Sequence, residues 1–207
     1  MEGAKNILIM RKSPLSLVLT LLATALPAFA QADRAHEVVI SVPDQKMVVF
    51  ENGAEMARFS VSTSRYGVGD STGSYATPLG SLEVAEKIGG NSPLGTVFKG
   101  RRPTGEILAP NAPGRDPIVT RILWLRGLDA GNRNAYQRAI YIHGTPVERL
   151  IGRPASYGCV RMRSCDVARL YNMIGVGAKI NICTASVRMA KAVYEAGRRH
   201  VTYLASL

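Results

Sequence analysis

The sequence has few of the residues from which metal sites are built. Three histidines and three cysteines are scattered over 207 residues, and no two cysteines form a Cys-x-x-Cys pair. A structural zinc site needs about four such ligands at short spacings, so we expect no bound metal. Aromatic residues are also scarce, at 6% of the chain. They do not alternate with basic residues as in proteins that bind single strands, which argues against a nucleic-acid partner.

Acidic residues are few relative to basic ones. The chain has 15 Asp and Glu against 26 Lys and Arg, so its formal net charge is +11. An excess of this size favours anionic partners. The simpler alternative is that most of the basic side chains form a solvated surface.

A long apolar run is missing, but a short one stands near the N-terminus. Two basic residues, Arg11 and Lys12, precede an apolar stretch over residues 15–26, and an Ala-x-Ala sequence ends at Ala30. This order is typical of a secretory signal peptide. The stretch is short for a membrane span, because a spanning helix needs about 20 apolar residues. We therefore predict a signal peptide over residues 1–30 and an exported protein of the periplasm or cell envelope. An uncleaved membrane anchor is the alternative.

One segment carries most of the chemical information. Cys159 directly follows Gly158, where a compact turn can expose the sulfur, and His143 lies upstream. A thiol has an unperturbed pKa of about 8.5 and reacts as the thiolate, so it needs a base near neutral pH. An imidazole can take that proton and later return it to a leaving group. Cys159 and His143 are therefore the candidate catalytic pair. The ordinary alternative is a small buried Cys and a hydrogen-bonded His.

The residues around His143 favour a strand. Residues 139–143 are rich in β-branched and aromatic types and are followed by Gly144, so His143 should lie at a strand end. Strand ends and loops are where a scaffold usually presents reacting groups. This placement strengthens the catalytic hypothesis.

Several short motifs occur in an order that is typical of one family. The positions that match its signature of a His, a spacer, and Ser/Thr-His-Gly-Cys followed by an apolar residue and Arg or Asn are His143, Ser156, Gly158, Cys159, Val160 and Arg161. Upstream, residues 42–50 look like the family's first hairpin strand, and residues 77–80 look like its Thr-Pro-x-Gly turn. On these motifs, residues 38–182 resemble the L,D-transpeptidase catalytic domain, also called the YkuD domain.

The resemblance implies a reaction and a set of roles. Cys159 would attack the amide carbonyl before the terminal D-Ala of a peptidoglycan tetrapeptide stem, with His143 as general base and acid. D-Ala would leave, and an amine from a neighbouring stem would resolve the thioester into a 3–3 cross-link, without a cofactor. Gly158 is implied in oxyanion stabilisation and Gly144 in orienting the imidazole. The candidate substrate-binding residues are Arg161, Tyr157, Ser156 and Tyr141. Arg161 could instead hold the motif turn.

One position departs from the family pattern. Tyr157 stands where the family usually has a His before Gly-Cys. Tyr can donate or accept a hydrogen bond but does not titrate near neutral pH. The acyl acceptor therefore stays open. Water would give an L,D-carboxypeptidase and a protein lysine would give an anchoring transpeptidase. A non-catalytic peptidoglycan-binding module is a further alternative.

Two cysteines remain outside this motif. If Cys159 must stay a thiol in an oxidising compartment, Cys165 and Cys183 are the pair left over, and they could be bridged or free. Cys183 ends an apolar run and fits a buried strand position.

The remaining pattern predicts a mainly β fold, a YkuD-like β-sandwich, with a catalytic domain over residues 36–184. Short alternating runs with turn signals, the strongest at Asn52-Gly53, predict a β-meander over residues 37–85. Residues 89–117 are rich in Gly, Pro and Arg and are interpreted as long loops around a site. The oligomeric state stays open.

Two helices are expected. After the motif, Ser164 or Asp166 is expected to cap a short helix that ends near Met173. A strand over residues 178–183 follows. Residues 185–207 predict a C-terminal amphipathic helix with one mostly basic and one apolar face, the latter through Ala190, Val193 and Gly197. Packing on its own domain is the ordinary role of this helix, and contact with an anionic membrane or envelope surface is the alternative.

Overall fold

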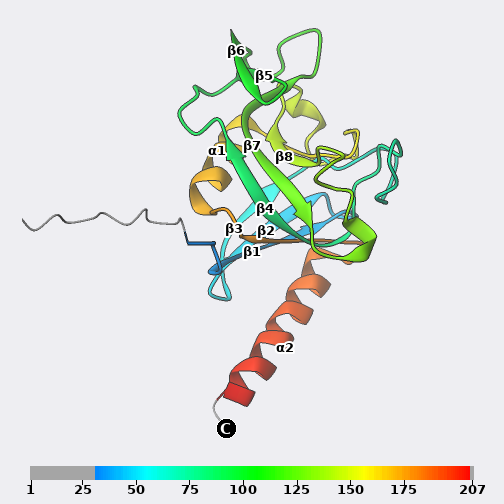
Figure 1. Cartoon of the computed structure of the whole chain (residues 1–207), viewed down its shortest axis with the longest axis vertical. Helices are drawn as coiled ribbons and strands as arrows, with labels where there is room; N and C mark the ends of the chain where they lie inside the picture. The colour runs from blue at the N-terminus through cyan, green and yellow to red at the C-terminus, as the bar shows by residue number, and fades with distance from the viewer. Residues whose placement is uncertain (1–30, 206–207) are drawn as a thin grey trace, which may run out of the picture. The chain divides into compact units, whose positions relative to one another are not determined.

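The computed structural model describes residues 31–205, and the side chains of residues 31–197. The predicted signal peptide lies outside the described residues. The mainly β fold is confirmed, with one helix after the motif and one at the C-terminal end (Figure 1). The strands are β1 (His36–Ser41), β2 (Lys46–Glu51), β3 (Ala54–Ser60), β4 (Gly80–Ile88), β5 (Thr96–Lys99), β6 (Arg102–Ile107), β7 (Ile118–Gly127), β8 (Tyr141–Gly144), β9 (Val160–Met162) and β10 (Lys179–Cys183). The helices are α1 (Ser164–Met173) and α2 (Val187–Ala205), with short 3₁₀ turns at Ala130–Asn132 and Glu148–Leu150.

The strands form one mixed sheet. Its hydrogen-bonded order is β3-β2-β1-β10-β4-β7-β5-β6, and β8 pairs with β7 and β9 away from this path. Two of the pairings are parallel, β1 with β10 and β8 with β9, and the others are antiparallel. The parallel β8–β9 pair matters most for function, because it sets the two signature segments side by side.

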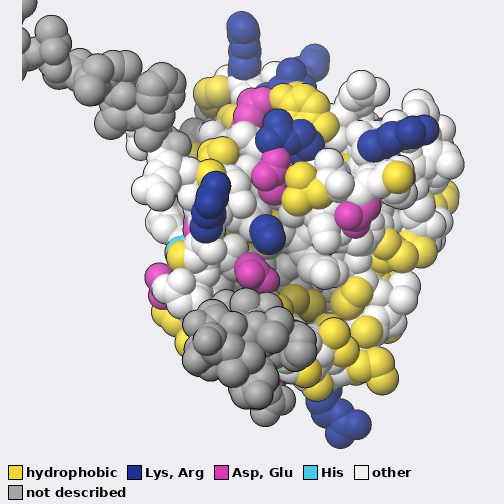
Figure 2. Space-filling view, turned by 60° about the horizontal axis from the view of Figure 1, so that its bottom comes forward, with side chains coloured by type: hydrophobic (Ala, Val, Ile, Leu, Met, Phe, Trp, Pro, Cys, Tyr) yellow, Lys and Arg dark blue, Asp and Glu magenta, His cyan; other side chains and the backbone are white. Residues whose placement is uncertain are grey.

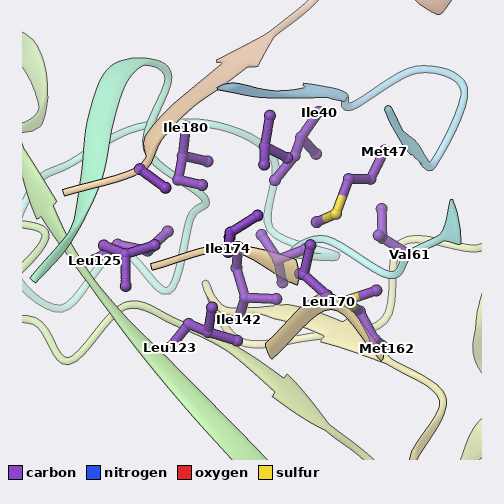
Figure 3. Close-up of a cluster of buried hydrophobic side chains, with 14 of the residues drawn as sticks. Ile40, Met47, Val61, Leu123, Leu125, Ile142, Met162, Leu170, Ile174 and Ile180 are labelled. Atoms are coloured by element: carbon purple, nitrogen blue, oxygen red, sulfur yellow. The ribbon is translucent and has the colours of Figure 1, made fainter. Parts of the chain in front are cut away.

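The main core lies between two parts of this sheet and α1. Strands β1, β2 and β10 contribute aliphatic side chains from one side, and β7, β8 and β9 contribute them from the other (Figure 3). Val167 and Leu170 of α1 are fully buried in the same cluster, and Ile174 follows directly after the helix. The helix predicted after the motif is confirmed, and its buried side chains pack in the same cluster as those of β8 and β9.

Helix α2 covers the other face of the first hairpin. Val39, Val48 and Phe50 form a second cluster with Val187, and Ala190 and Tyr194 pack against it. The ring centroids of Phe50 and Tyr194 lie 4.4 Å apart. The predicted helix is confirmed, but its packed stripe differs from the expected one. Val193 is 68% exposed, because the stripe in contact with the sheet runs through Val187, Ala190 and Tyr194.

The expected cap of α1 is wrong. Ser164 and Asp166 lie inside the helix, and Arg163 occupies the cap position without a side-chain hydrogen bond. The Ser164 amide instead donates to Glu148 Oε1 at 2.8 Å. A carboxylate at the positive end of the helix satisfies one of its free amides from a distant part of the chain.

The segment 89–117 is more regular than the sequence analysis predicts. It contains the hairpin of β5 and β6, joined by Gly100 and Arg101, which both have positive φ. Every residue of β6 is exposed, and the strand contains Pro103 and Gly105. Pro and Gly are tolerated there because β6 lies at the edge of the sheet. The Asn52-Gly53 turn between β2 and β3 is where the sequence places it.

None of the described helices has the length and apolar character that a membrane span requires.

Candidate active site

The parallel β8–β9 pair sets His143 and Cys159 on the same face of the sheet. Ile142 pairs with Val160, and both side chains lie in the main core. Since side chains alternate along a strand, His143 projects to the opposite face. Cys159, just before β9, packs on that face beside Tyr141 and Trp124.

Cys159 is half-buried, and its sulfur has two backbone partners. The Tyr141 amide donates to Sγ at 3.4 Å, and Sγ donates to the Ala139 carbonyl at 3.5 Å. Burial raises the pKa of the thiol to about 11, although the Tyr141 amide and the charges of Arg138 and Arg161 act in the opposite direction. The resting sulfur is therefore a neutral thiol whose proton lies toward Ala139.

His143 is buried, and its tautomer follows from a single contact. Nδ1 lies 2.8 Å from the Gly144 carbonyl oxygen. A carbonyl oxygen only accepts, so Nδ1 carries the proton and Nε2 keeps its free lone pair. Burial lowers the pKa of His143 to about 4, more than the Gly144 hydrogen bond raises it. The resting imidazole is thus neutral and presents one basic nitrogen.

Gly144 has a steric reason to be glycine. A Cβ atom at this position would lie 2.6 Å from the Val119 carbonyl oxygen of β7. Real Cβ atoms do not come so close to backbone atoms, so the tight β7–β8 approach requires Gly. Any larger residue would shift β8 and with it His143.

The turn before Cys159 is held by Ser156 and Thr77. Ser156 is buried, and its hydroxyl donates to the Cys159 carbonyl at 2.6 Å and accepts from the Gly158 amide at 3.3 Å. Thr77 Oγ1 donates to the Gly158 carbonyl at 3.0 Å. Gly158 has φ +118°, a conformation that other residues rarely adopt. Both hydrogen bonds of the Ser156 hydroxyl are therefore made within the turn. From the sequence, Ser156 is instead a candidate substrate contact.

The Arg161 side chain binds other residues of the protein. Its guanidinium is buried, forms an ion pair with Asp116, and donates to Ser62 Oγ at 3.4 Å. Asp116 also accepts a hydrogen bond of 2.5 Å from Thr145 Oγ1. Of the two expectations for Arg161, the geometry fits the structural one, in which it holds the strands of the motif. Asp116 has no sequence signal, because only the fold brings it to Arg161.

Tyr141 is buried and faces the protein rather than an open cleft. Its ring packs edge-on against Trp124, with centroids 5.6 Å apart, and its hydroxyl accepts from Arg101 at 3.4 Å. Its amide, not its side chain, contacts the sulfur of Cys159. Tyr157, by contrast, is strongly exposed beside the motif.

A second charge pair behind the site was not foreseen in the sequence. Arg138 and Asp70 are both buried and joined at 2.8 Å. Arg138 also donates to the Ala76 carbonyl at 2.7 Å. It precedes Ala139, whose carbonyl accepts the thiol proton. Arg138 thus ties the loop after β3 to the backbone that contacts the sulfur.

The other cysteines are free thiols, Cys165 exposed on α1 and Cys183 half-buried at the end of β10. The disulfide that the sequence left open is not formed.

Among the described side chains, no group of three or more His, Cys, Asp or Glu could hold a metal ion. On the face in Figure 2, basic side chains lie singly between acidic, apolar and uncharged ones rather than in one patch.

Comparison with known proteins identifies the family. Residues 35–182 match the model of the L,D-transpeptidase catalytic domain, YkuD. The chain belongs to this family. A probable L,D-transpeptidase of Escherichia coli K12, YcfS, is 26% identical over 156 residues, which are 74% of this chain and 45% of that protein. This chain therefore spans less than half the length of the relative.

Solved L,D-transpeptidases are similar at lower identity. One from Mycobacterium tuberculosis H37Rv is 18% identical, with a TM-score of 0.48, over 72% of this chain and 57% of that one. One from Xylanimonas cellulosilytica is 17% identical, with a TM-score of 0.46, over 74% and 62% of the two chains.

Proposed function

We propose that the protein is an exported L,D-transpeptidase that cross-links peptidoglycan stems. The observation that carries this proposal is the parallel β8–β9 pair, which places a neutral His143 with a basic Nε2 on the same face as the Cys159 thiol. Membership of the L,D-transpeptidase catalytic domain family supports the substrate class. Peptidoglycan lies outside the cytoplasm, so the substrate agrees with the predicted signal peptide and with a location in the periplasm or envelope.

The first half-reaction transfers an acyl group to sulfur. Nε2 of His143 takes the proton from Cys159 Sγ, and the thiolate attacks the carbonyl before the terminal D-Ala. The Cys159 amide is the oxyanion donor that we assign, because the Gly158 amide is engaged by Ser156. Loss of one oxyanion donor costs about 3–4 kcal/mol in other enzymes. The carbon–nitrogen bond then breaks, the imidazolium protonates the departing amine, and D-Ala leaves a thioester on Cys159.

The second half-reaction restores the thiol. An amine of a neighbouring stem attacks the thioester carbonyl, His143 accepts the proton of that amine, and the leaving thiolate takes it back. The product is a 3–3 cross-link. Because the resting thiol and imidazole are both neutral, we assign the proton transfer to the substrate-bound state, in which the incoming carbonyl and the oxyanion donor stabilise the charge that develops.

Turnover of purified stems tests this assignment. Wild-type protein is incubated with tetrapeptide muropeptides, with and without an amine acceptor, and products are separated by mass. We expect D-Ala release with dimer formation only when the acceptor is present. His143→Asn should slow release by about 10²–10⁴-fold, the usual contribution of a general base, and Cys159→Ala should abolish it. Release of D-Ala without a dimer would instead identify a carboxypeptidase, and transfer to a protein lysine an anchoring enzyme.

A non-catalytic wall-binding module is the second candidate. Two observations favour it: Tyr157 replaces the usual His of the family signature, and the resting thiol is not ionised. A carbapenem reports directly on the sulfur because it acylates an active cysteine. A mass adduct on Cys159 of wild-type protein would exclude the binding module. Sedimentation with wall sacculi without any adduct would support it.

A further inference from the structure

Three tyrosines form an exposed cluster at the edge of the motif. Tyr66, Tyr75 and Tyr157 are 50%, 57% and 56% exposed. Their ring centroids lie 5.5 Å to 5.9 Å from one another, so each ring contacts the other two. Clustered exposed aromatic rings are unusual on a soluble surface and mark sites of recognition.

Arg65 is held by two of these rings. Its guanidinium carbon lies 5.0 Å from the centroid of Tyr66 and 4.5 Å from that of Tyr157. One terminal nitrogen donates to both phenol oxygens, that of Tyr66 at 3.0 Å. No carboxylate within the described part of the chain forms an ion pair with Arg65, whereas Arg58, Arg115, Arg126, Arg138 and Arg161 each have one. The positive charge of Arg65 is therefore uncompensated.

The cluster is fixed to the motif that carries Cys159. The Arg65 amide donates to the Ser156 carbonyl at 3.2 Å. Ser64 Oγ accepts from the Tyr66 amide at 2.9 Å and donates to the Tyr75 carbonyl at 2.5 Å. Tyr75 has φ +55°, a conformation that costs a non-glycine residue about 1–3 kcal/mol and that is common in ligand clamps. The loop is thus held in one conformation against the motif.

We propose that Arg65, with the hydroxyls of Tyr66 and Tyr157, binds a carboxylate of the stem peptide and positions that peptide at Cys159. This inference rests on the proposed function. Because the phenol oxygens accept from Arg65, their own hydrogens are free to donate. Nη2 of Arg65 donates to both phenols, so its Nε–H and Nη1–H groups are left to donate a charge-assisted hydrogen bond to a carboxylate. One anion can therefore receive donors from three side chains, one of which, Tyr157, is two residues before the nucleophile in the sequence.

Peptide binding to a variant that cannot react tests this without turnover. In the Cys159→Ala protein, calorimetry measures the affinity for a tetrapeptide stem and for stems in which each carboxyl group is amidated in turn. We expect amidation of one carboxyl group to weaken binding by about 10- to 100-fold, the range for a charge-assisted contact. Adding Arg65→Ala should cause the same loss for the free stem and no further loss for that amidated stem. Arg65→Lys should recover part of the affinity, and Tyr66→Phe or Tyr157→Phe should lose about 2- to 5-fold.

The matched control is Arg58→Ala, which removes the same charge from β3, where Arg58 is paired with Glu55. It should leave the affinity within about twofold. Thermal unfolding checks that each variant is folded. Equal affinity in Arg65→Ala and its parent would overturn the proposal, as would equal effects of amidation in both, or no peptide binding at all. Failure of turnover with intact, Arg65-dependent binding would overturn the proposed function alone.

Discussion

At the scale of single residues, burial keeps both Cys159 and His143 neutral in this structure. Burial raises the pKa of Cys159 to about 11 and lowers that of His143 to about 4. Both shifts favour the neutral form, since burial penalises charge. The sequence predicts that the Cys159 thiol needs a base, which His143 can supply. The structure indicates a neutral pair in which the Gly144 carbonyl selects the tautomer with a basic Nε2.

This neutral pair predicts the pH dependence of Cys159 alkylation. With a raised pKa, the thiolate population should be small near pH 7 and increase up to about pH 11. The rate of modification by iodoacetamide, measured on the Cys159 peptide by mass spectrometry, should therefore rise throughout the range from pH 8 to 10. The protein used carries Cys165→Ser and Cys183→Ser, and a Cys159 peptide in urea provides the unfolded reference. A plateau already reached below pH 8 would show a preformed thiolate–imidazolium pair and contradict the structure.

Only part of the site was accessible to sequence analysis. Cys159 and His143 could be predicted as candidates because adjacent residues carry the signal: a Gly before the thiol and a strand-like run before the His. The carboxylates that hold the site's arginines lie far from these motifs in the sequence. Asp116 meets Arg161, and Asp70 meets Arg138, across long stretches of chain. Such pairs depend on strand register, which no local pattern in one sequence determines.

At the scale of elements, local turn chemistry separates the strands that could be predicted from those that could not. The hairpin at Asn52-Gly53 has the residues that its turn requires. The β5–β6 hairpin lacks that signal, because its turn is Gly100-Arg101 and its edge strand carries Pro103 and Gly105. Residues that usually indicate loops are tolerated at an edge, so the sequence suggested a long loop.

Helix α2 was also predicted only in part from the sequence, and its packing leads to a stability prediction. Its period was clear in the sequence, but the packed stripe includes Tyr194 against Phe50 rather than Val193. Tyr194→Ala should lower the free energy of unfolding by about 1–2 kcal/mol, less than for a fully buried ring because Tyr194 is half-buried. Met189→Ala, an exposed position of the same helix, should change it by less than about 0.5 kcal/mol. Both are measured by urea unfolding. No loss in Tyr194→Ala would mean that α2 does not pack on the sheet in solution, and would favour the membrane or envelope contact.

At the scale of the whole molecule, the sheet positions the signature segments, whereas the net positive charge acts on anionic partners. One mixed sheet brings the two signature segments together as β8 and β9, and α1 supports them. The chain has a net charge of +11. On the face in Figure 2, the basic side chains are not gathered into a single groove. Such a diffuse electrostatic field attracts any anionic material. Recognition of one particular ligand requires localised groups such as Arg65.

This division predicts how wall binding responds to salt. The Debye length falls from about 14 Å at 50 mM salt to about 6 Å at 300 mM, so a diffuse attraction should be screened. Binding of purified protein to sacculi, measured by sedimentation, should weaken by about tenfold over this range. Arg58→Gln or Arg126→Gln should each change it by less than about twofold, because each removes one charge among many. Alkylation of Cys159 by neutral iodoacetamide should not depend on salt, which shows that the fold is intact. Salt-independent binding would mean that the envelope is recognised through local contacts alone, and the surplus charge would then have no part in it.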